Sequence, residues 1–270
     1  MRVTVLGSGS RGNAVLVESG DGAILVDAGF SLKEITRRCA RAGRDPARIR
    51  AIVLTHEHGD HSRGAAIASQ AWAVPIAGSP GTLQALDHVI RPDTPQIPLA
   101  AARGIRLGGF TITAYPTPHD ACEPVVLVAE DHEGRRIGVA CDVGSPSTAL
   151  RHAIRGLDAL IIESNHDEVM LRASDYPASV RARIAGRAGH LSNAEAARLI
   201  ADAAHRGLSL VILAHLSERC NRAELALETT QAALRGTGFA GTVLVAGQDD
   251  PTDCIEVGTS MAQYSLPLGR

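Results

Sequence analysis

The chain has 270 residues, of which 27 are basic and 29 acidic, so its formal net charge at pH 7 is −2. This balance excludes a strongly basic surface over the whole molecule, and any attraction to phosphate would have to come from a local patch or from bound cations. Aromatic residues make up 3% of the chain and hydrophobic residues 45%. The core must therefore be aliphatic, and we do not expect a platform of aromatic rings for stacking bases.

Length and composition predict one domain over residues 1–270. The five cysteines are widely spaced and form no C-x-x-C pair, which indicates reduced thiols in a cytoplasmic protein. The N-terminus runs directly into a predicted strand, and no apolar run approaches the length of a membrane span, so we expect neither export nor membrane insertion. The cysteines are Cys39, Cys122, Cys141, Cys220 and Cys254.

The first part of the chain predicts three strands and a helix, at residues 3–6, 14–18, 23–27 and 32–42. A glycine-rich segment, residues 7–13, separates the first two strands. It lacks the lysine of a P-loop, and we interpret it as a tight loop between strands and a candidate lining of a site. The apolar run 51–54 then predicts a buried strand, and the alanine-rich segment 62–73 predicts a helix.

Three imidazoles and a carboxylate fall within six positions directly after the predicted strand 51–54: His56, His58, Asp60 and His61. Residues two apart in an extended segment project to the same side, so His56 and His58 can hold one metal ion. The chain turns at a glycine, so that Asp60 and His61 can face a second ion. Imidazole and carboxylate ligands without thiolate suit zinc, manganese or iron. Surface histidines at a strand end are the alternative, which this density disfavours.

Strand and helix signals alternate through the rest of the chain. Strands are predicted at residues 110–115, 125–130 and 136–141, with Glu133 and Gly134 as a hairpin turn. Helices at 147–154, 193–205 and 223–234 then alternate with strands at 157–162, 208–213 and 242–245. The tail, residues 258–270, has weak periodicity, and we expect it to be loosely ordered.

The pattern H-x-H-x-D-H after an apolar strand resembles the signature of the metallo-β-lactamase superfamily. The resemblance implies an α/β fold, the four-layer αββα sandwich of the metallo-β-lactamase type, with two metals at one edge of the paired sheets. It also implies a later His, a later Asp or Cys and a final His, each at a strand end. Only short connections separate the motifs, so we expect no cap domain and no β-CASP insertion.

The later ligands have candidates in this chain. His119, stiffened by two neighbouring prolines, matches the third ligand of the first metal, beside His56 and His58. His215 matches the last ligand of the second metal, with Asp60 and His61. Asp142 matches the bridging ligand. In this respect the chain resembles the superfamily's phosphodiesterases, which use a carboxylate as the bridging ligand. Its neighbour Cys141 projects to the opposite face of the strand, and we interpret it as a small buried hydrophobe.

A second group of residues resembles the nuclease branch of the superfamily, closest to the WalJ/YycJ-type family, whose members are described as exonuclease-like. The resemblance is carried by residues 5–13, 163–167, 189–193 and 215–221. It implies that His190 is not a metal ligand and assists the leaving group, and that Glu163 orients His190. The alternative for His190 is a residue near the N-cap of the following helix.

Together these resemblances imply a dinuclear-metal-dependent hydrolase with two zinc or manganese ions. The favoured substrate is nucleic acid, DNA over RNA, with 5'-3' exonuclease-like hydrolysis of phosphodiesters. Asp60, His190 and Glu163 are the candidate catalytic residues, with Asp60 accepting a hydrogen bond from the nucleophile. A ribonuclease Z-type endonuclease and a thioester or lactone hydrolase are the alternatives. A di-iron redox domain is disfavoured because His58 replaces the expected glutamate, and a metal-free scaffold because every ligand is present.

Four arginines, Arg172, Arg181, Arg183 and Arg187, flank Asp175 in the segment that leads to His190. They form either a phosphate-binding patch or the solvated face of a short helix.

Arg11 stands where the WalJ/YycJ-type family is expected to have a serine, which bears on the substrate. We expect structural roles for most remaining histidines, whereas His166 is either structural or borders the substrate path. Those with structural roles are His88, His132, His152 and His205.

Overall fold

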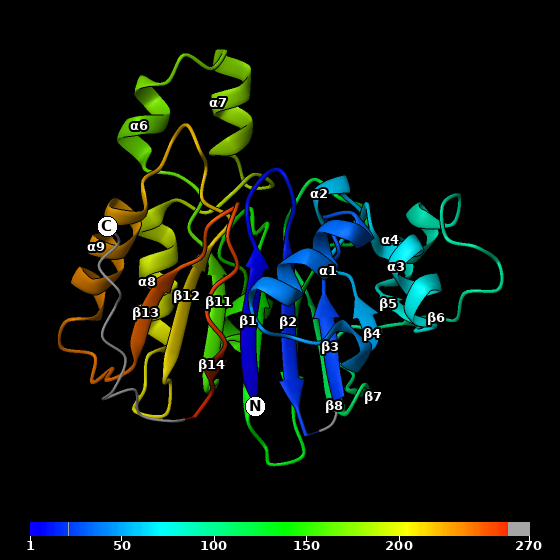
Figure 1. Cartoon of the computed structure of the whole chain (residues 1–270). Helices are drawn as coiled ribbons and strands as arrows, with labels where there is room; N and C mark the ends of the chain where they lie inside the picture. The colour runs from blue at the N-terminus through cyan, green and yellow to red at the C-terminus, as the bar shows by residue number, and fades with distance from the viewer. Residues whose placement is uncertain (21, 259–270) are drawn as a thin grey trace.

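Two seven-stranded β-sheets lie face to face, and helices cover the outer face of each (Figure 1). The computed structural model describes residues 1–20 and 22–258. This layering confirms the predicted αββα sandwich. The predicted loose tail lies outside the described residues apart from its first residue, and the absence of a cap or β-CASP insertion stays a prediction.

The first sheet comes from the N-terminal half of the chain, apart from one edge strand, β14. Three helices pack on it, α1 (Leu32–Arg41), α3 (Ala65–Trp72) and α4 (Pro80–Leu86), with a short 3-10 helix, η1 (Pro46–Arg48), and a single turn, α2 (Gly59–Ser62). In spatial order the strands are β14 (Ile255–Glu256), β1 (Arg2–Gly7), β2 (Ala14–Ser19), β3 (Gly22–Val26), β4 (Ile49–Val53), β5 (Ile76–Gly78) and β6 (Gln96–Pro98).

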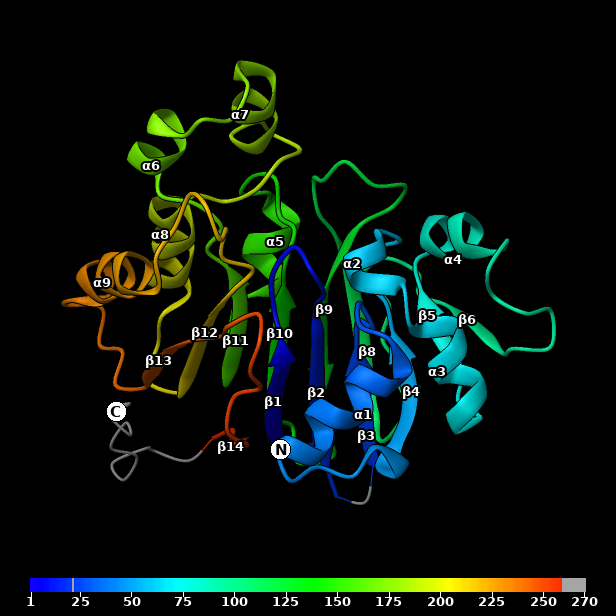
Figure 2. The same cartoon turned by 45° about the horizontal axis from the view of Figure 1, so that its top comes forward.

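The second sheet comes from the C-terminal half. Its helices are α5 (Thr148–Ala153), α8 (Asn193–Ala203) and α9 (Ala223–Leu234), while α6 (Glu168–Ala173) and α7 (Ala178–Ile184) rise above the sheet (Figure 2). In spatial order the strands are β13 (Thr242–Val245), β12 (Leu210–Ala214), β11 (Ala159–Glu163), β10 (Arg136–Ala140), β9 (Val125–Glu130), β8 (Phe110–Pro116) and β7 (Ile105–Leu107).

The central strands are apolar on both faces because each face is covered. Along β12, Leu210, Ile212 and Ala214 belong to the core between the sheets, whereas Val211 and Leu213 belong to the core beneath the helices of the second sheet. This period of two explains why the run carries no polar residue. Every residue of β12 is buried, and so is every residue of β11. The polar side chains that these two strands can contribute to a site are therefore expected at the strand ends.

The predicted helix 62–73 is wrong at its start. A single turn, α2, ends at Ser62, and α3 begins only at Ala65. At the break, Gly64 N–H donates to the Ala28 carbonyl at 2.7 Å, and a Cβ atom on Gly64 would lie 2.0 Å from the Phe30 carbonyl oxygen. The helix is interrupted because the chain must pass this close to the loop after β3.

Sequence periodicity also missed the shortest elements, which have two to seven residues and carry too few positions for a periodic signal. The other predicted elements are present, with ends that differ by at most two residues, and the hairpin turn at Gly134 is confirmed by its positive φ of 77°. The missed elements are η1, β5, α4, β6, β7, α6, α7, β14 and the turn α2.

The carboxyl ends of β3, β4, β10, β11 and β12 meet at the upper edge of the sandwich in Figures 1 and 2. Three non-glycine residues adopt left-handed backbone at or just beyond these ends: Asp27 (φ 59°), Asp142 (φ 52°) and His215 (φ 53°). This conformation is costly for residues with a Cβ atom, and such strain gathers at functional sites.

No helix in the described ranges, 1–20 and 22–258, has the length and apolar character needed to span a bilayer.

Candidate metal centre

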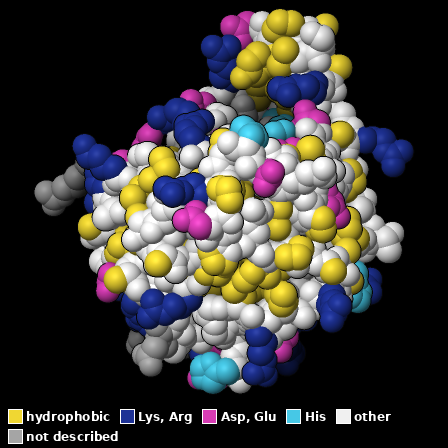
Figure 3. All heavy atoms as spheres, turned by 90° about the vertical axis from the view of Figure 1, so that its right-hand side faces the viewer, with side chains coloured by type: hydrophobic (Ala, Val, Ile, Leu, Met, Phe, Trp, Pro, Cys, Tyr) yellow, Lys and Arg dark blue, Asp and Glu magenta, His cyan; other side chains and the backbone are white. Residues whose placement is uncertain are grey.

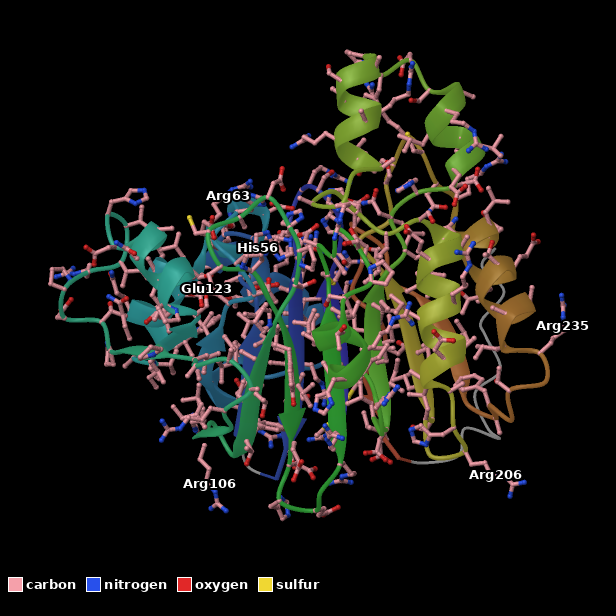
Figure 4. All side chains as sticks on the ribbon, turned by 180° about the vertical axis from the view of Figure 1, so that it is seen from behind. His56, Arg63, Arg106, Glu123, Arg206 and Arg235 are labelled. Atoms are coloured by element: carbon pink, nitrogen blue, oxygen red, sulfur yellow. The ribbon has the colours of Figure 1, made fainter. Side chains whose placement is uncertain are left out.

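The structure brings all the predicted site residues together at this upper edge. Their potential ligand atoms form three overlapping groups, and within each group the atoms lie no more than 4.8 Å apart. Figure 4 shows His56 at the upper ends of the strands, and Figure 3 shows imidazoles in a hollow beneath the projecting helices. The groups are His56, His58 and His119; Asp60, His61, Asp142 and His215; and Asp142, Glu163, His190 and His215.

Each imidazole of the first group has one nitrogen close to a backbone or hydroxyl oxygen atom. His58 Nε2–H donates to the Asp120 carbonyl at 3.2 Å, and His119 Nδ1–H donates to the Gly189 carbonyl at 3.1 Å. His119 Nε2 lies 3.2 Å from the half-exposed carboxylate of Asp120. His56 Nδ1 lies 3.0 Å from Thr55 Oγ1, while its Nε2 is buried with no hydrogen-bond partner among the described residues. The backbone and hydroxyl contacts orient the rings, so that the second nitrogen of each ring could hold an ion; on His119 the ion would take the place of the Asp120 contact.

The second group is centred on the buried carboxylate of Asp142. Its Oδ2 lies 2.5 Å from His61 Nε2 and 3.5 Å from His56 Nε2, so one oxygen faces both groups. His215 Nε2 is buried without a hydrogen-bond partner in the described part of the chain, and it lies 3.6 Å from Asp60 Oδ2. Orphaned buried nitrogen and carboxylate atoms that converge in this way fit a pair of divalent cations.

The electrostatics of the metal-free site favour protonation of the imidazoles in the second group, whereas burial lowers the pKa of His56 and of His119 in the first. Burial alone would raise the pKa of Asp142, but His215 and His61 outweigh burial and hold that pKa well below its ordinary value. Burial lowers the pKa of His61, and the carboxylates of Asp27 and Asp142 outweigh burial and raise it to about 10. The positive charge that compensates Asp142 is therefore held on imidazolium rings when no metal is bound.

Asp27 is a residue of the site that the sequence motifs did not identify. Its Oδ2 accepts from His61 Nδ1–H at 2.7 Å, and its Oδ1 accepts from the Thr55 backbone N–H at 2.8 Å. Thr55 Oγ1 also contacts both Asp27 oxygens and lies beside His56 Nδ1, so Asp27 orients the imidazoles of both groups. A carboxylate at a strand end, the same signal that marked Asp142, could have identified it.

The glycine-rich loop, residues 8–13, lines the centre. Asn13 Nδ2 lies 2.9 Å from His61 Nε2 and 3.4 Å from Asp60 Oδ2. Ser8 Oγ donates to Asn13 Oδ1 and accepts from the His215 backbone N–H, both at 2.9 Å. Arg11 holds the loop from outside, through Glu218 and Asp249. The loop is therefore a wall of the site, as its position between strands suggested, and Asn13 and Ser8 are its contact residues.

The predicted pair of Glu163 and His190 is present. His190 Nδ1–H donates to Glu163 Oε1 at 2.6 Å, and the same nitrogen lies 3.2 Å from Asp142 Oδ1. Glu163 is fully buried, and its Oε2 accepts from the backbone N–H groups of Val143 and Leu191. Burial lowers the pKa of His190, but Glu163 and Asp142 outweigh burial and raise it to about 9.

Buried amides support the strand ends from behind. Asn165 Nδ2 donates to the His215 carbonyl at 2.9 Å, and Asn221 Nδ2 donates to the carbonyls of Ser164 and Asn165.

Cys141 lies in the core between the sheets, and burial raises the pKa of its thiol well above its ordinary value. The interpretation of Cys141 as a small buried hydrophobe is therefore confirmed.

The predicted arginine patch divides into different roles. Arg181 Nη1 donates to the carbonyls of Ser174 and Tyr176, which fixes the connection between α6 and α7. Arg183 is exposed and lies 3.3 Å from Asp120, in the loop that carries His119. Arg172 and Arg187 are exposed on the same projecting segment. Phosphate binding by these residues stays a prediction.

Comparison with known proteins agrees with this geometry. Residues 23–216 match the family model described as the beta-lactamase superfamily domain. The exodeoxyribonuclease YycJ of Bacillus anthracis is 32% identical over 88% of this chain and 91% of its own length. The ribonuclease Z of Mycobacterium bovis is 26% identical over 70% of this chain and 82% of its own length. The metallo-β-lactamase fold protein YhfI of Bacillus subtilis has a TM-score of 0.70 at 22% identity, covering 93% of this chain and 98% of that one.

The chain belongs to the metallo-β-lactamase superfamily, as its motifs predicted, and it is a hydrolase of that superfamily. Over most of its length it is similar to a protein named an exodeoxyribonuclease, which supports the predicted nuclease branch.

Metal binding is expected to release about two protons near pH 7. His61 has a pKa of about 10, and the pKa of His215 is raised well above its ordinary value because Asp142 and Glu163 outweigh burial. Both rings are protonated below these pKa values, so affinity for Zn²⁺ should rise as the pH increases from about 6 to 9. Calorimetric titration in buffers of different ionisation enthalpy counts the protons. Equal heats in all buffers would contradict this protonation state.

The substitution Asp27→Asn should weaken metal binding by about 10- to 100-fold, because it removes the charge that orients His61. Competition with a chromogenic chelator measures the affinity. Asp131→Asn is the matched control, since it also removes a buried carboxylate but one that contacts Ser19 and Arg135 instead of the centre. Unchanged affinity in Asp27→Asn would show that the ligands need no such support.

Proposed function

We propose that this protein is a two-metal phosphodiesterase that hydrolyses DNA with 5'-3' exonuclease-like action. The observation that carries the proposal is the Glu163–His190 pair beside Asp142. An imidazole tied to a buried carboxylate is a suitable acid for a departing oxygen. His190 also keeps 22% of its side chain exposed, so it can meet a substrate. The name of the Bacillus anthracis relative supports DNA as the substrate.

We infer that the first ion is held by His56, His58 and His119, and the second by Asp60, His61 and His215, with Asp142 between them. The nitrogen and carboxylate donors suit zinc or manganese. When bound, two such cations lower the pKa of a shared water and stabilise charge on the phosphoryl oxygens.

The protein's own residues complete the reaction. Asp60, 23% exposed at its side chain, is placed to accept a hydrogen bond from the attacking water. Glu163 fixes Nδ1–H of His190, which directs the other ring nitrogen to the leaving group. A protonated His190 can give its proton to the departing oxygen. Arg183 and Arg187, exposed on the segment that leads to His190, are suited to contact phosphates of the polynucleotide.

An RNA-processing endonuclease of the ribonuclease Z type is the second candidate, because the ribonuclease Z of Mycobacterium bovis matches 70% of this chain.

We propose a cytoplasmic location for either activity. The five cysteines, all within the described residues, form no disulfide, which supports a reducing compartment.

Product lengths distinguish the two candidates. The protein loaded with Zn²⁺ or Mn²⁺ is incubated with end-labelled duplex DNA, single-stranded DNA and a tRNA precursor. Mononucleotides released from the 5' end of DNA are expected. A single internal cut in the tRNA precursor would instead assign ribonuclease Z activity. Hydrolysis of a thioester but not of bis(p-nitrophenyl) phosphate would overturn both candidates.

The substitution His190→Ala should lower turnover on DNA by about 10²- to 10⁴-fold while both metals remain bound. The loss should be much smaller on bis(p-nitrophenyl) phosphate, because p-nitrophenolate departs without being protonated. Steady-state kinetics and metal analysis provide the two measurements. His132→Ala, an exposed histidine in the β9–β10 turn, is the control. Loss of metal from His190→Ala would make His190 a ligand and would contradict the proposed role.

A further inference from the structure

A chain of hydrogen bonds joins two candidate ligands of the second ion through the glycine-rich loop between β1 and β2, which rises at the upper edge of the sandwich (Figure 1). The backbone N–H of His215 donates to Ser8 Oγ, and Ser8 Oγ–H donates to Asn13 Oδ1, both at 2.9 Å. Asn13 Nδ2–H in turn donates to Asp60 Oδ2 at 3.4 Å. His215 follows a strand of the second sheet, whereas Asp60 follows a strand of the first. The loop therefore connects the two sheets at the place where both contribute candidate ligands to one ion.

The surroundings of Asn13, which is 3% exposed, fix the orientation of its side-chain amide. Its Oδ1 accepts from the Gly9 backbone N–H at 2.9 Å as well as from Ser8, so an exchange of the oxygen and nitrogen atoms would lose both hydrogen bonds. Its Nδ2 donates to the Gly9 carbonyl at 3.1 Å, which uses one of its two N–H groups within the loop. The other N–H faces the centre, where it meets Asp60 and His61.

The backbone of Asn13 is held as closely as its side chain. Its N–H donates to the Asp60 carbonyl at 2.7 Å, and its carbonyl accepts from the Gly29 N–H at 2.9 Å. A Cβ atom on Gly29 would lie 1.7 Å from the Asp60 carbonyl oxygen and 2.7 Å from Asn13 N. The loop, the turn that carries Asp60 and the segment after β3 are thus in direct contact. Asn13 cannot move relative to Asp60 unless these segments separate.

Outside the centre, Gln248 holds the same loop through contacts that involve no candidate ligand. Its Oε1 accepts from the Arg11 backbone N–H at 2.7 Å, and its Nε2 donates to the Gly12 carbonyl at 2.9 Å. These contacts remain when the side chain of Ser8 or Asn13 is shortened. Substitutions at the two residues should therefore alter the contacts with the centre and leave the path of the loop in place.

The candidate ligands of the first ion receive their support from other residues. Thr55, Asp120 and Gly189 contact the imidazoles of that group. Across residues 1–20 and 22–258, neither Ser8 nor Asn13 forms a hydrogen bond with any of those imidazoles. The loop therefore acts on one ion of the expected pair.

We propose that Ser8 and Asn13 are positioning residues that strengthen binding of the second ion and leave the first unaffected; the inference rests on the ligand sets of the proposed function. Once His61 Nε2 binds an ion, it cannot accept from Asn13, so Asp60 is the acceptor that remains for the N–H facing the centre. This hydrogen bond fixes the Asp60 carboxylate, as partners of metal ligands commonly do. Ser8 acts on the other ligand, because it holds the backbone of His215 in its left-handed conformation, with φ of 53°.

Bound Zn²⁺ per chain, measured against free Zn²⁺ set by chelator buffers, tests the proposal without any readout of hydrolysis. Asn13→Ala and Ser8→Ala should each bind one of the two ions about 10- to 100-fold more weakly than the wild type. His58→Ala should weaken the other ion, so a variant with both His58→Ala and Asn13→Ala should hold no ion where each single variant still holds one. Ser19→Ala is the matched control, because Ser19 is also buried but its Oγ donates to Asp131 Oδ2, away from the centre.

The outcomes separate this proposal from the proposed function. Wild-type affinity for both ions in Asn13→Ala and Ser8→Ala overturns the positioning role, even if the metal-loaded enzyme cleaves DNA. One ion retained by the variant with both His58→Ala and Asn13→Ala overturns the assignment to the second ion. One weakened ion in Asn13→Ala, in a protein that hydrolyses no phosphodiester, supports the positioning role and instead overturns the nuclease.

Added Zn²⁺ distinguishes a positioning role from a general structural one. Turnover of Asn13→Ala on DNA should be restored at about 10- to 100-fold higher free Zn²⁺, because the candidate ligands themselves are unchanged. Turnover that stays low at every Zn²⁺ concentration would contradict the proposal. Ser8→Ala, in which Asn13 keeps its contacts with Gly9, keeps the test decisive if Asn13→Ala does not fold.

Discussion

The rest of this structure depends on a buried carboxylate that must be surrounded by compensating groups. Asp142 is almost fully buried, and its oxygens face His56 and His61 on one side and His190 and His215 on the other. A buried charge left without partners is strongly destabilising. The two sheets therefore have to bring their strand ends to the same place, because the carboxylate follows a strand of the second sheet and the histidine cluster follows a strand of the first.

Rigid strands explain how candidate ligands far apart in sequence meet with defined geometry. Parallel strands deliver their carboxyl ends to one edge, and left-handed backbone at Asp27, Asp142 and His215 occurs at this edge. Behind the ligands, Asp27 and the buried amides of Asn165 and Asn221 engage the remaining hydrogen-bonding groups. Support of this kind determines which ring nitrogen is free, and hence where an ion can sit.

The segment between β11 and α8 connects the metal centre to the surface above it. It begins next to Glu163, rises through α6 and α7, and returns at His190, so its two ends meet in the hydrogen-bonded Glu163–His190 pair. Arg181 closes the segment on itself, while Arg183 links it to the loop that carries His119. The same segment forms part of the lining of a cavity of about 290 Å³.

The sequence by itself determined the class of fold and the candidate metal ligands. Local spacing in the sequence identifies His56, His58, Asp60 and His61. The apolar runs that precede them, which predict buried strands, identify His119, Asp142 and His215. Only the tertiary structure decided the role of Asp27, Asn13 and Ser8, whose contacts join residues between 34 and 207 positions apart. The break at Gly64 was likewise decided there. The physical cause in each case is packing between distant segments, which leaves no periodic or local pattern in the chain.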